Sequence, residues 1–328
     1  MLLSIVVLSY NRPLQVQRIL NNLRGVRSSD FNLIIKDDCS PRSIEIKEIV
    51  ENFKSNLGFE LVFHSNSKNL GYDLNLIDSF SIATSDYVFL LSDDDYLNGL
   101  ELISLLDFLK VNTKKVLFTP YLDGGVVRRS NAKDSFHLNK FSDVIYNSIL
   151  FSGLIFHRKS VVNLPKDMKF LSNCIYSQVY IASVLVFSEK DFGFSIENLL
   201  YLGGDGENFF GKNSSAVNSN ILMDRGQIYS DLRYQSFLLR VVEKIATDTS
   251  PIVYKSFLKE YRKRMVAYGL RARGYGLERY ISFLKHHFES KNLNSFFIPF
   301  ALFILIFVPA VISEKLYCYL KNRFKKSG

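Results

Sequence analysis

The run Ser85-Asp86-Tyr87-Val88-Phe89-Leu90-Leu91-Ser92-Asp93-Asp94-Asp95 joins an apolar stretch directly to three consecutive aspartates. Its residues Tyr87–Leu91 are uninterruptedly apolar or aromatic, which is typical of a strand buried on both faces of a parallel sheet. Apolar residues then recur with helical spacing from Gly99 to Val111, so the acids occupy a turn between a strand and a helix. Because open α/β sheets bind ligands beyond the carboxyl ends of their strands, this turn is the predicted site.

The first 120 residues repeat this alternation of apolar runs and helical segments. Buried strands are predicted at Leu3–Ser9, Phe31–Ile35, Phe59–Phe63, Tyr87–Leu91 and Val116–Thr119. Helices are predicted from Asn11-Arg12-Pro13 onward and at Ser43–Phe53, Tyr72–Ala83 and Gly99–Val111. The alternation predicts an α/β fold with a Rossmann-like, mostly parallel sheet and flanking helices.

Polar clusters follow three of the predicted strands, namely Tyr10-Asn11-Arg12, Asp37-Asp38 and Asp93-Asp94-Asp95. The ends of parallel strands meet at one edge of a sheet, so the topology predicts that these clusters converge on one cleft. Adjacent carboxylates raise one another's pKa, and a hard divalent cation such as Mg²⁺ or Mn²⁺ removes that cost. Without a metal, the same acids could instead favour the positive end of the helix that follows.

The rest of the chain is less regular and then becomes helical. Gly124-Gly125, with Arg128-Arg129, suggests a loop or a hairpin, Gly153–Phe156 a strand, and Cys174–Phe187 either a helix or a pair of strands. Helical spacing returns at Asp224–Ala246, at Leu277–Phe288, and from Pro251, with Ser250 as its cap, to about Leu270. We therefore predict an α/β domain over residues 1–215 and a helical C-terminal region over 216–328.

Charge is distributed unevenly along the chain, whose formal net charge is +9. Residues 1–230 carry 23 basic and 25 acidic side chains, whereas residues 231–328 carry 18 basic and 7 acidic ones. A predicted α/β body with a slight acidic excess does not have the profile of a nucleic-acid-binding domain. Hydrophobic residues make up 47%, which excludes a disordered chain, and three widely spaced cysteines favour a reducing compartment over a disulfide framework.

Residues 296–312 form a run of 17 residues without a charged or strongly polar side chain, interrupted only by Pro299 and Pro309. A spanning helix needs about 20 residues, and both prolines remove helix hydrogen bonds, so a segment that dips into one leaflet fits better than a crossing. Basic residues flank the run on both sides, which favours the cytoplasmic face of the inner membrane, with the protein peripheral or monotopic there. A helix buried in a soluble core is the alternative.

Four motifs, in order, resemble the family 2 glycosyltransferases with a GT-A fold, in particular those of bacterial surface-polysaccharide synthesis. The matching segments are Ser4–Arg12, Ile34–Ser40, Asn69–Asn75 and Ser85–Asp95. Each motif is weak by itself, but four of them in this order across roughly the first 100 residues are specific together. The resemblance implies a nucleotide-diphosphate sugar as donor, a glycan as acceptor and Mn²⁺ or Mg²⁺ as cofactor.

The resemblance also implies roles for individual residues. Asp38 would hydrogen-bond the nucleobase, and Asp94, with Asp95 helping, would hold the metal against the diphosphate. The DxD motif of the family falls on Ser92-Asp93-Asp94, so Asp93 would face the ribose or sugar, and the division of labour among the acids stays open. The remaining nucleotide-sugar-binding candidates are Ser9, Tyr10, Asn11, Arg12, Asn69, Gly71 and Asp73. Ordinary turns are the alternative for Asp38, Asn69 and Gly71.

The general base is the weakest part of the resemblance. The family usually places it at the start of an acceptor-side helix, and the matching stretch Ser172–Gln178 contains no acid. Substitutes are the loop acids Asp205 and Glu207, with His157 as a third candidate, although each could equally be structural or solvated. The expected reaction is inverting rather than retaining, and only an inverting transfer needs such a base in this form.

We therefore expect a glycosyltransferase that moves one sugar from a nucleotide donor to a hydroxyl of a lipid-linked glycan at the membrane surface. Two alternatives stay open: a metal-dependent nucleotidyl or phosphoryl transferase, and a membrane adaptor that binds a nucleotide sugar without transferring it. The first would normally bring a phosphate-binding GxxxxGK[ST] loop, and the sequence contains none. No nucleic-acid partner is expected.

Overall fold

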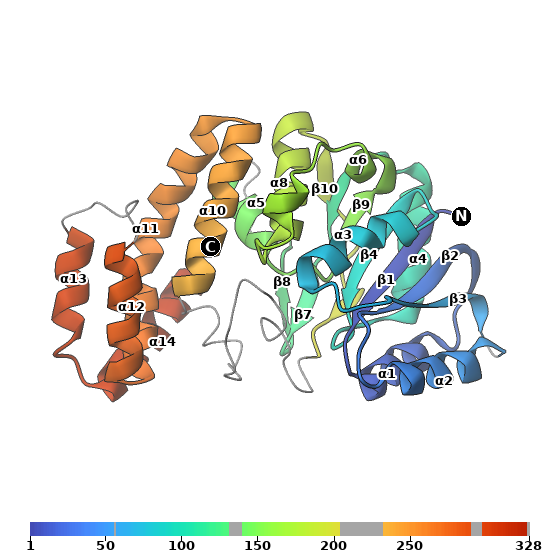
Figure 1. The fold of residues 1–328 in the computed structure, drawn as a ribbon, viewed down its shortest axis with the longest axis horizontal. Helices are drawn as coiled ribbons and strands as arrows, with labels where there is room; N and C mark the ends of the chain where they lie inside the picture. Colours follow the sequence, from blue (N-terminus) through green and yellow to red (C-terminus); the bar gives the residue numbers. More distant parts are fainter. Residues whose placement is uncertain (56, 131–139, 204–231, 290–296, 327–328) are drawn as a thin grey trace. The chain divides into compact units, whose positions relative to one another are not determined.

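The computed structural model describes residues 1–55, 57–130, 140–203, 232–289 and 297–326 (Figure 1). The chain divides into two compact units, one made of Met1–Leu138 with Asp143–Asn220 and the other of Asn139–Ser142 with Ile221–Gly328. The first unit holds the α/β part and the second the C-terminal helices. The predicted boundary at residues 215 and 216 lies outside the described residues and stays a prediction.

The elements of the α/β part follow the predicted alternation. The strands are β1 (Leu3–Ser9), β2 (Arg27–Asp37), β3 (Gly58–Ser65), β4 (Tyr87–Ser92), β5 (Tyr96–Leu97), β6 (Val116–Phe118), β7 (Tyr121–Asp123), β8 (Val126–Arg128), β9 (Leu154–His157), β10 (Phe192–Phe194) and β11 (Leu200–Tyr201). The helices are α1 (Pro13–Leu23), α2 (Ser43–Lys54), α3 (Tyr72–Ile82), α4 (Gly99–Val111), α5 (Phe141–Asn147), α6 (Arg158–Val162), α7 (Met168–Leu171) and α8 (Ser177–Glu189). Every strand and helix predicted within the first 120 residues is therefore present.

The main sheet is mixed rather than uniformly parallel. Its strand order is β10-β6-β9-β4-β1-β2-β3, and the pairs β1–β2, β1–β4, β2–β3 and β10–β6 are parallel. Strand β9 lies between β4 and β6 and runs antiparallel to both of them. The predicted α/β class is confirmed, with one antiparallel strand that the alternation of strands and helices does not reveal.

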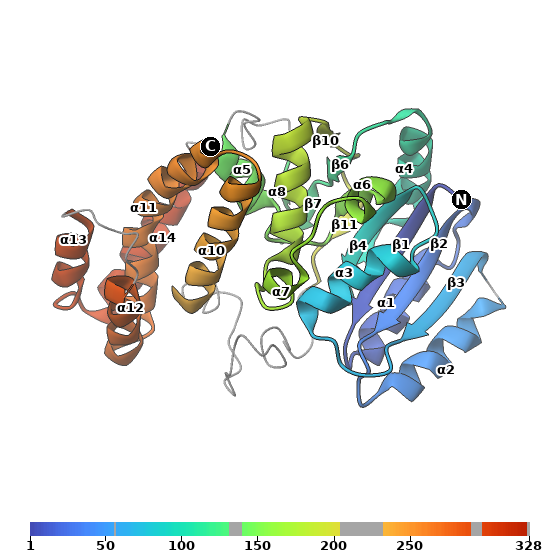
Figure 2. The same cartoon turned by 45° about the horizontal axis from the view of Figure 1, so that its top comes forward.

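Alternate residues of the central strands pack against different helix layers. Leu3, Ile5 and Val7 of β1 share one buried core with apolar residues of α1, α2 and α4. Helices α3, α6 and α8 cover the other face of the sheet, and Figure 2 shows them opposite α1 and α2. On that face Phe80 of α3 packs edge-on against Phe156 of β9, with ring centroids 5.4 Å apart. Helices on both faces bury the strands completely, which explains their continuous apolar runs.

The register of the central strands brings the three predicted polar clusters to one edge. Ser9 of β1 pairs with Asp37 of β2, and Leu8 pairs with Ser92 of β4. Just beyond the strand ends, the Asp38 N–H donates to the Ser9 carbonyl at 3.1 Å, and the Asp93 N–H donates to the Leu8 carbonyl at 3.3 Å. The strands therefore end together, as the predicted convergence requires.

A second, smaller sheet has the order β5-β11-β7-β8. Strands β7 and β8 are antiparallel and form the hairpin predicted at Gly124-Gly125, and the ambiguous stretch Cys174–Phe187 contributes helix α8 rather than strands. Strands β5, β10 and β11 were not predicted, because runs of two or three residues carry too little periodicity to be recognised.

The C-terminal unit is helical, as predicted. Its helices are α10 (Leu232–Asp248), α11 (Pro251–Gly274), α12 (Leu277–Glu289), α13 (Phe297–Leu305) and α14 (Ala310–Lys326). Pro251 occupies the first turn of α11, but the Ser250 side chain makes no capping hydrogen bond in the described structure. Gly269 of α11 allows a close approach of α13, since a Cβ there would lie 2.6 Å from Leu302 Cδ2.

The apolar run 296–312 does not form one continuous helix. Helix α13 ends at Leu305 and α14 begins at Ala310, directly after Pro309, so the proline interrupts the helix as expected. None of the described helices is both long and apolar enough to cross a membrane. Leu302 and Leu305 are buried within the unit, whereas Phe300, Phe303, Ile304 and Phe307 are 47–74% exposed. The segment is thus partly core and partly an exposed apolar surface.

Candidate active site

Arg12 and Asp93 link the ends of β1 and β4. Asp93 is buried, and its Oδ1 accepts a hydrogen bond from Arg12 Nη1 at 2.7 Å, while its Oδ2 accepts from the Tyr10 N–H at 3.1 Å. Asn11, between Tyr10 and Arg12 in the sequence, has a φ of 60°, a left-handed conformation that turns the chain sharply before α1. Burial raises the pKa of Asp93 to about 6, although the Arg12 guanidinium opposes this effect. Arg12 thus compensates a carboxylate that burial would otherwise protonate.

The three acids of the triplet have different surroundings. Asp94 Oδ1 accepts a hydrogen bond from Ser92 Oγ at 2.5 Å, and Asp94 Oδ2 lies 3.5 Å from Arg12 Nη1. The backbone carbonyl of Asp94 also accepts a hydrogen bond from Arg18 Nη2, at 2.7 Å. Asp95 is buried, and its Oδ1 accepts from the Gly203 N–H at 3.2 Å. Ser92 occupies the first position of the family's DxD motif. Its hydroxyl therefore orients the carboxylate of Asp94, which occupies the third position of that motif.

A divalent metal fits this edge only as an ion that the substrate helps to hold. In the described part of the chain, no group of three His, Cys, Asp or Glu side chains is arranged to bind a metal by itself. Asp93 and Asp95 are buried, whereas Asp94 is partly exposed, so Asp94 is the best-placed ligand. Mg²⁺ commonly takes one or two carboxylates together with substrate phosphates, so the residues present suit that arrangement.

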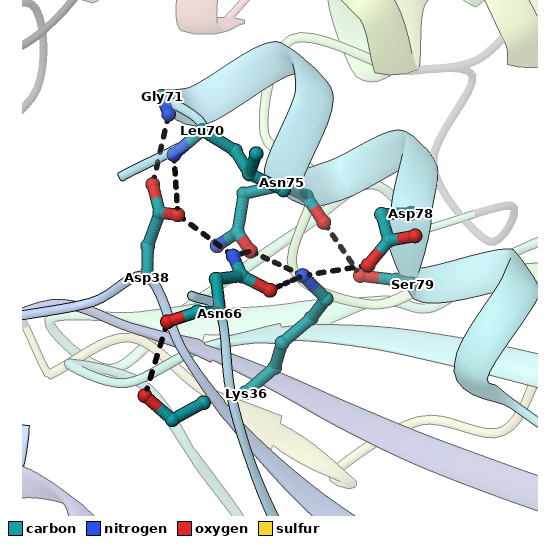
Figure 3. Close-up of polar contacts among 9 residues, drawn as sticks. Lys36, Asp38, Asn66, Leu70, Gly71, Asn75, Asp78 and Ser79 are labelled. Atoms are coloured by element: carbon teal, nitrogen blue, oxygen red, sulfur yellow. Dashed lines mark hydrogen bonds and ion pairs between the residues drawn. The ribbon is translucent and has the colours of Figure 1, made fainter. Parts of the chain in front are cut away.

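Asp38 organises the loop before α3, as Figure 3 shows. Its Oδ1 accepts hydrogen bonds from the Leu70 N–H at 2.8 Å and from Asn66 Nδ2 at 2.7 Å, and its Oδ2 accepts from the Gly71 N–H at 2.9 Å. Asn69 Oδ1 accepts from the same Gly71 N–H, and the φ of 75° at Gly71 is one that glycine adopts without strain. The carboxylate thereby fixes the turn that the family resemblance assigns to the nucleotide.

A buried lysine lies behind this turn. Lys36 of β2 is completely buried, and its Nζ contacts Asn66 Oδ1 at 3.0 Å, Asn75 Oδ1 at 2.5 Å and Asp78 Oδ2 at 3.1 Å. Burial lowers the pKa of Lys36, and the negative charges of Asp78 and Asp38 oppose that shift. We did not predict this cluster, although a lysine at the end of the apolar run Phe31–Ile35 is a signal that could have revealed it.

Asp73 of α3 holds the start of α8. Its Oδ2 accepts hydrogen bonds from the N–H groups of Cys174 and Ile175 at 3.0 and 2.7 Å, and its Oδ1 accepts from the Ser177 N–H at 3.2 Å. Ile175 has a φ of 66°, which is unusual for a β-branched residue and costs backbone strain. A carboxylate therefore does reach the acid-free stretch 172–178, but it comes from α3 and its oxygens bind the backbone.

The structure brings most of the predicted site residues together at this edge. Ser9, Tyr10, Asn11, Arg12, Asp38 and the triplet lie at adjoining strand ends, and Ser9 Oγ and Asn11 Oδ1 are buried with no hydrogen-bond partner among the described residues. Asn69, Gly71 and Asp73 follow at the turn into α3. Asp205 and Glu207 lie outside the described residues, so their role as base stays a prediction.

His157 was wrong as a candidate base. It pairs with Tyr87 at the beginning of β4, because β9 runs antiparallel, and this register places it at the opposite edge of the sheet from Asp93. Its Nδ1 lies 2.9 Å from Ser160 Oγ, a local contact at the start of α6.

Three comparisons agree with this geometry. Residues 4–171, just over half of the chain, match the model of glycosyl transferase family 2. Among curated proteins, the abequosyltransferase RfbV of Salmonella typhimurium is 31% identical over 99 residues, which is 30% of this chain and 29% of RfbV. The poly(ribitol-phosphate) beta-N-acetylglucosaminyltransferase TarP of Staphylococcus aureus is 26% identical over 194 residues, or 57% of this chain and 58% of TarP. The chain thus spans less than two thirds of either relative.

Solved structures share the fold at low sequence identity. Staphylococcus aureus TarS 1-349 in complex with UDP-GlcNAc superposes with a TM-score of 0.57 at 17% identity, covering 87% of this chain and 81% of TarS 1-349. The mannosyltransferase PcManGT of Pyrobaculum calidifontis, in complex with GDP-Man and Mn²⁺, gives a TM-score of 0.54 at 13% identity over 97% of this chain and 84% of its own. With a GT-A-like fold and a family model that covers the whole polar edge of the sheet, the chain belongs to glycosyl transferase family 2.

Proposed function

We propose that the protein transfers a single sugar from a nucleotide-diphosphate sugar to a hydroxyl of a glycan in the synthesis of a bacterial surface polysaccharide. The observation that carries the proposal is the joint placement, at adjoining strand ends, of the Asp38 turn and the Arg12–Asp93–Asp94 group. The names of RfbV, TarP and TarS and the nucleotide sugars bound in the solved structures support the donor class and the polysaccharide setting.

Different residues would bind the nucleoside of the donor and its sugar diphosphate. The Asp38 turn would bind the nucleoside, and Asp93, held by Arg12 and the Tyr10 N–H, would face the ribose or sugar. A metal bound to Asp94, with Asp95 nearby, would act as a Lewis acid on the leaving diphosphate. The acceptor hydroxyl then attacks the anomeric carbon, and the family favours inversion; Asp205 and Glu207 are the candidates to take its proton.

Product analysis tests the reaction class. The protein would be incubated with UDP-, GDP-, CDP- and dTDP-sugars, with Mn²⁺ or with EDTA, and the released nucleotide identified by chromatography. We expect a nucleoside diphosphate from one class of donor, with release suppressed by EDTA and restored by Mn²⁺. Release of a sugar 1-phosphate would instead indicate nucleotidyl transfer, and release of a nucleoside monophosphate would indicate transfer of the sugar phosphate. Binding in a thermal-shift assay without any release, even with lipid-linked glycan extracts as acceptor, would favour a non-catalytic adaptor.

We also propose that the helical unit docks on the cytoplasmic face of the inner membrane, where a lipid-linked acceptor would be presented. Helix α13 leaves Phe300, Phe303 and Ile304 exposed, Phe307 follows in the turn after it, and α14 adds Val311, Ile312, Leu316 and Tyr319. The net charge of +11 over residues 231–328 complements an anionic leaflet. Wild-type protein should therefore float with vesicles of phosphatidylglycerol and phosphatidylethanolamine, and float less with purely zwitterionic ones. Equal behaviour toward both, or no flotation, would contradict the proposal.

A further inference from the structure

Lys36 is a fully buried cation on an apolar strand. It lies on β2 after Ile34 and Ile35, both buried, and its side chain is 0% exposed. Lysine is among the residues least often buried completely, because removing an ammonium from water is expensive unless charges and hydrogen bonds compensate. A substitution by an aliphatic residue would avoid that cost, so the position calls for an explanation beyond packing.

The contacts of Lys36 use its whole donor capacity. An ammonium has three N–H donors and no acceptor, and three oxygens surround it, from Asn66, Asn75 and Asp78 (Figure 3). Because Nζ can only donate, both asparagines must turn their Oδ1 atoms toward it. Lys36 therefore determines the orientation of the side-chain amides of Asn66 and Asn75.

The orientation of the Asn66 amide in turn determines the position of the Asp38 carboxylate. With its oxygen on Lys36, Asn66 directs Nδ2 toward Asp38 Oδ1 at 2.7 Å and toward Asn75 Oδ1 at 2.9 Å. Were the amide reversed, its oxygen would face the Asp38 carboxylate, and two acceptors would repel each other. The correct amide orientation thus draws Asp38 into the position where it also accepts from the Leu70 and Gly71 N–H groups.

We propose that Lys36 is a positioning residue of the nucleotide subsite, acting through Asn66 on Asp38. The inference rests on the proposed function, since it takes the Asp38 turn to be the place where the nucleoside of the donor binds. Among the described residues, Asp38 Oδ2 receives only the Gly71 N–H, so this oxygen keeps acceptor capacity for an N–H of a nucleobase. Lys36 itself need not touch the ligand.

The test is a double-mutant cycle on nucleotide affinity. Binding of UDP, GDP, CDP and dTDP in the presence of Mn²⁺ would be measured calorimetrically for wild type, Lys36→Met, Asp38→Asn and the double variant. For the diphosphate that wild type binds best, Lys36→Met should weaken affinity about tenfold, as expected when a buried charge-assisted contact is lost. In the Asp38→Asn background the same substitution should cost less than about twofold, because the effect travels through Asp38.

Steady-state kinetics separate positioning from a general structural defect. In Lys36→Met the KM for the nucleotide sugar should rise about tenfold while kcat changes less than threefold. Lys110→Met is the matched control: this lysine of α4 is half exposed and forms its ion pairs with Asp30 and Asp107 at the surface, so affinity should change less than twofold. Where Lys36→Met does not fold, Asn66→Leu takes its place, because it interrupts the same chain of contacts.

The outcomes are distinct. Undiminished affinity in a folded Lys36→Met variant would overturn the positioning role alone, as would an equally large loss in the Asp38→Asn background. If wild type binds none of the nucleoside diphosphates, the proposed donor class fails and the inference fails with it.

Discussion

The edge of the sheet and the outer face of α13 and α14 depart from ordinary protein surfaces in opposite ways. At the sheet edge, charged groups such as Lys36, Asp73 and Asp93 are buried and paired. In the C-terminal unit, Phe303 of α13 is 56% exposed, and Phe307 in the turn that follows α13 is 74% exposed. Buried charge and exposed aromatic surface are both energetically expensive. The difference is the one that ligand geometry in the first unit and the proposed membrane attachment of the second would require.

Asp94→Ala should produce the largest difference between the effect on donor turnover and the effect on vesicle binding. Removing the best-placed metal ligand should lower the rate of donor turnover about 10³-fold, because stabilisation of the leaving diphosphate is lost. Vesicle flotation should not change. Donor turnover is measured by nucleoside diphosphate release, with the exposed Asp107→Ala of α4 as control. Turnover within tenfold of wild type would remove Asp94 from the metal site.

Asp73→Asn tests whether buried charge in the first unit sets geometry. The amide would place an N–H₂ against backbone N–H groups of residues 174–177, and we expect a loss of about 3 kcal/mol in the free energy of unfolding. Urea denaturation measures it, and Asp123→Asn, at a half-exposed side chain, is the control. Since the start of α8 would be released, any acceptor KM should rise more than the donor KM; the reverse order would contradict a role on the acceptor side.

Phe303→Ser combined with Phe307→Ser should affect only attachment. Loss of two partly inserted rings should weaken binding to anionic vesicles by about 2 kcal/mol, or roughly 30-fold. Nucleotide affinity should be unaltered. Ile44→Ser with Leu100→Ser, two exposed apolar residues of the α/β unit, provides the matched control. If the control pair weakens vesicle binding as much as the Phe303 and Phe307 pair does, membrane contact is not specific to the helical unit.

The smallest effect should be a pH dependence of stability that originates at Lys36. Burial lowers the pKa of Lys36 in the folded protein below the ordinary value of 10.5, which the unfolded chain retains. At a pH between the folded and the unfolded pKa, the unfolded chain therefore binds more protons than the folded one. The stability contribution of Lys36 should therefore rise as the pH approaches 10.5, despite the neighbouring Asp78 and Asp38. Urea unfolding at pH 8 and pH 10 would show a smaller rise in Lys36→Met; an identical rise would show that other groups cause it.

The sequence was sufficient for the strands and helices of the first 120 residues and for the meeting of three polar clusters at one edge. Periodicity and turn residues determine the strands and helices, and the parallel pairing of β1, β2 and β4 brings the polar clusters together. The interruption at Pro309 followed directly from the missing N–H of proline.

What could not be predicted depends on pairings between distant segments. The position of β9, and with it that of His157, follows from antiparallel pairing that no local pattern encodes. Asp73 meets residues 174–177 only because α3 and α8 share a face of the sheet. The amide orientations around Lys36 depend on hydrogen-bond partners from three different segments.

The antiparallel strand β9 also has a consequence for how the chain folds. Strand β4 can pair with β1 early, but its other edge stays open until residues 154–157 have been synthesised and inserted between β4 and β6. An apolar strand with an unpaired edge is a template for intermolecular association. The nascent protein should therefore be most prone to aggregation, and most dependent on chaperones, while the ribosome is still translating the residues between β4 and β9.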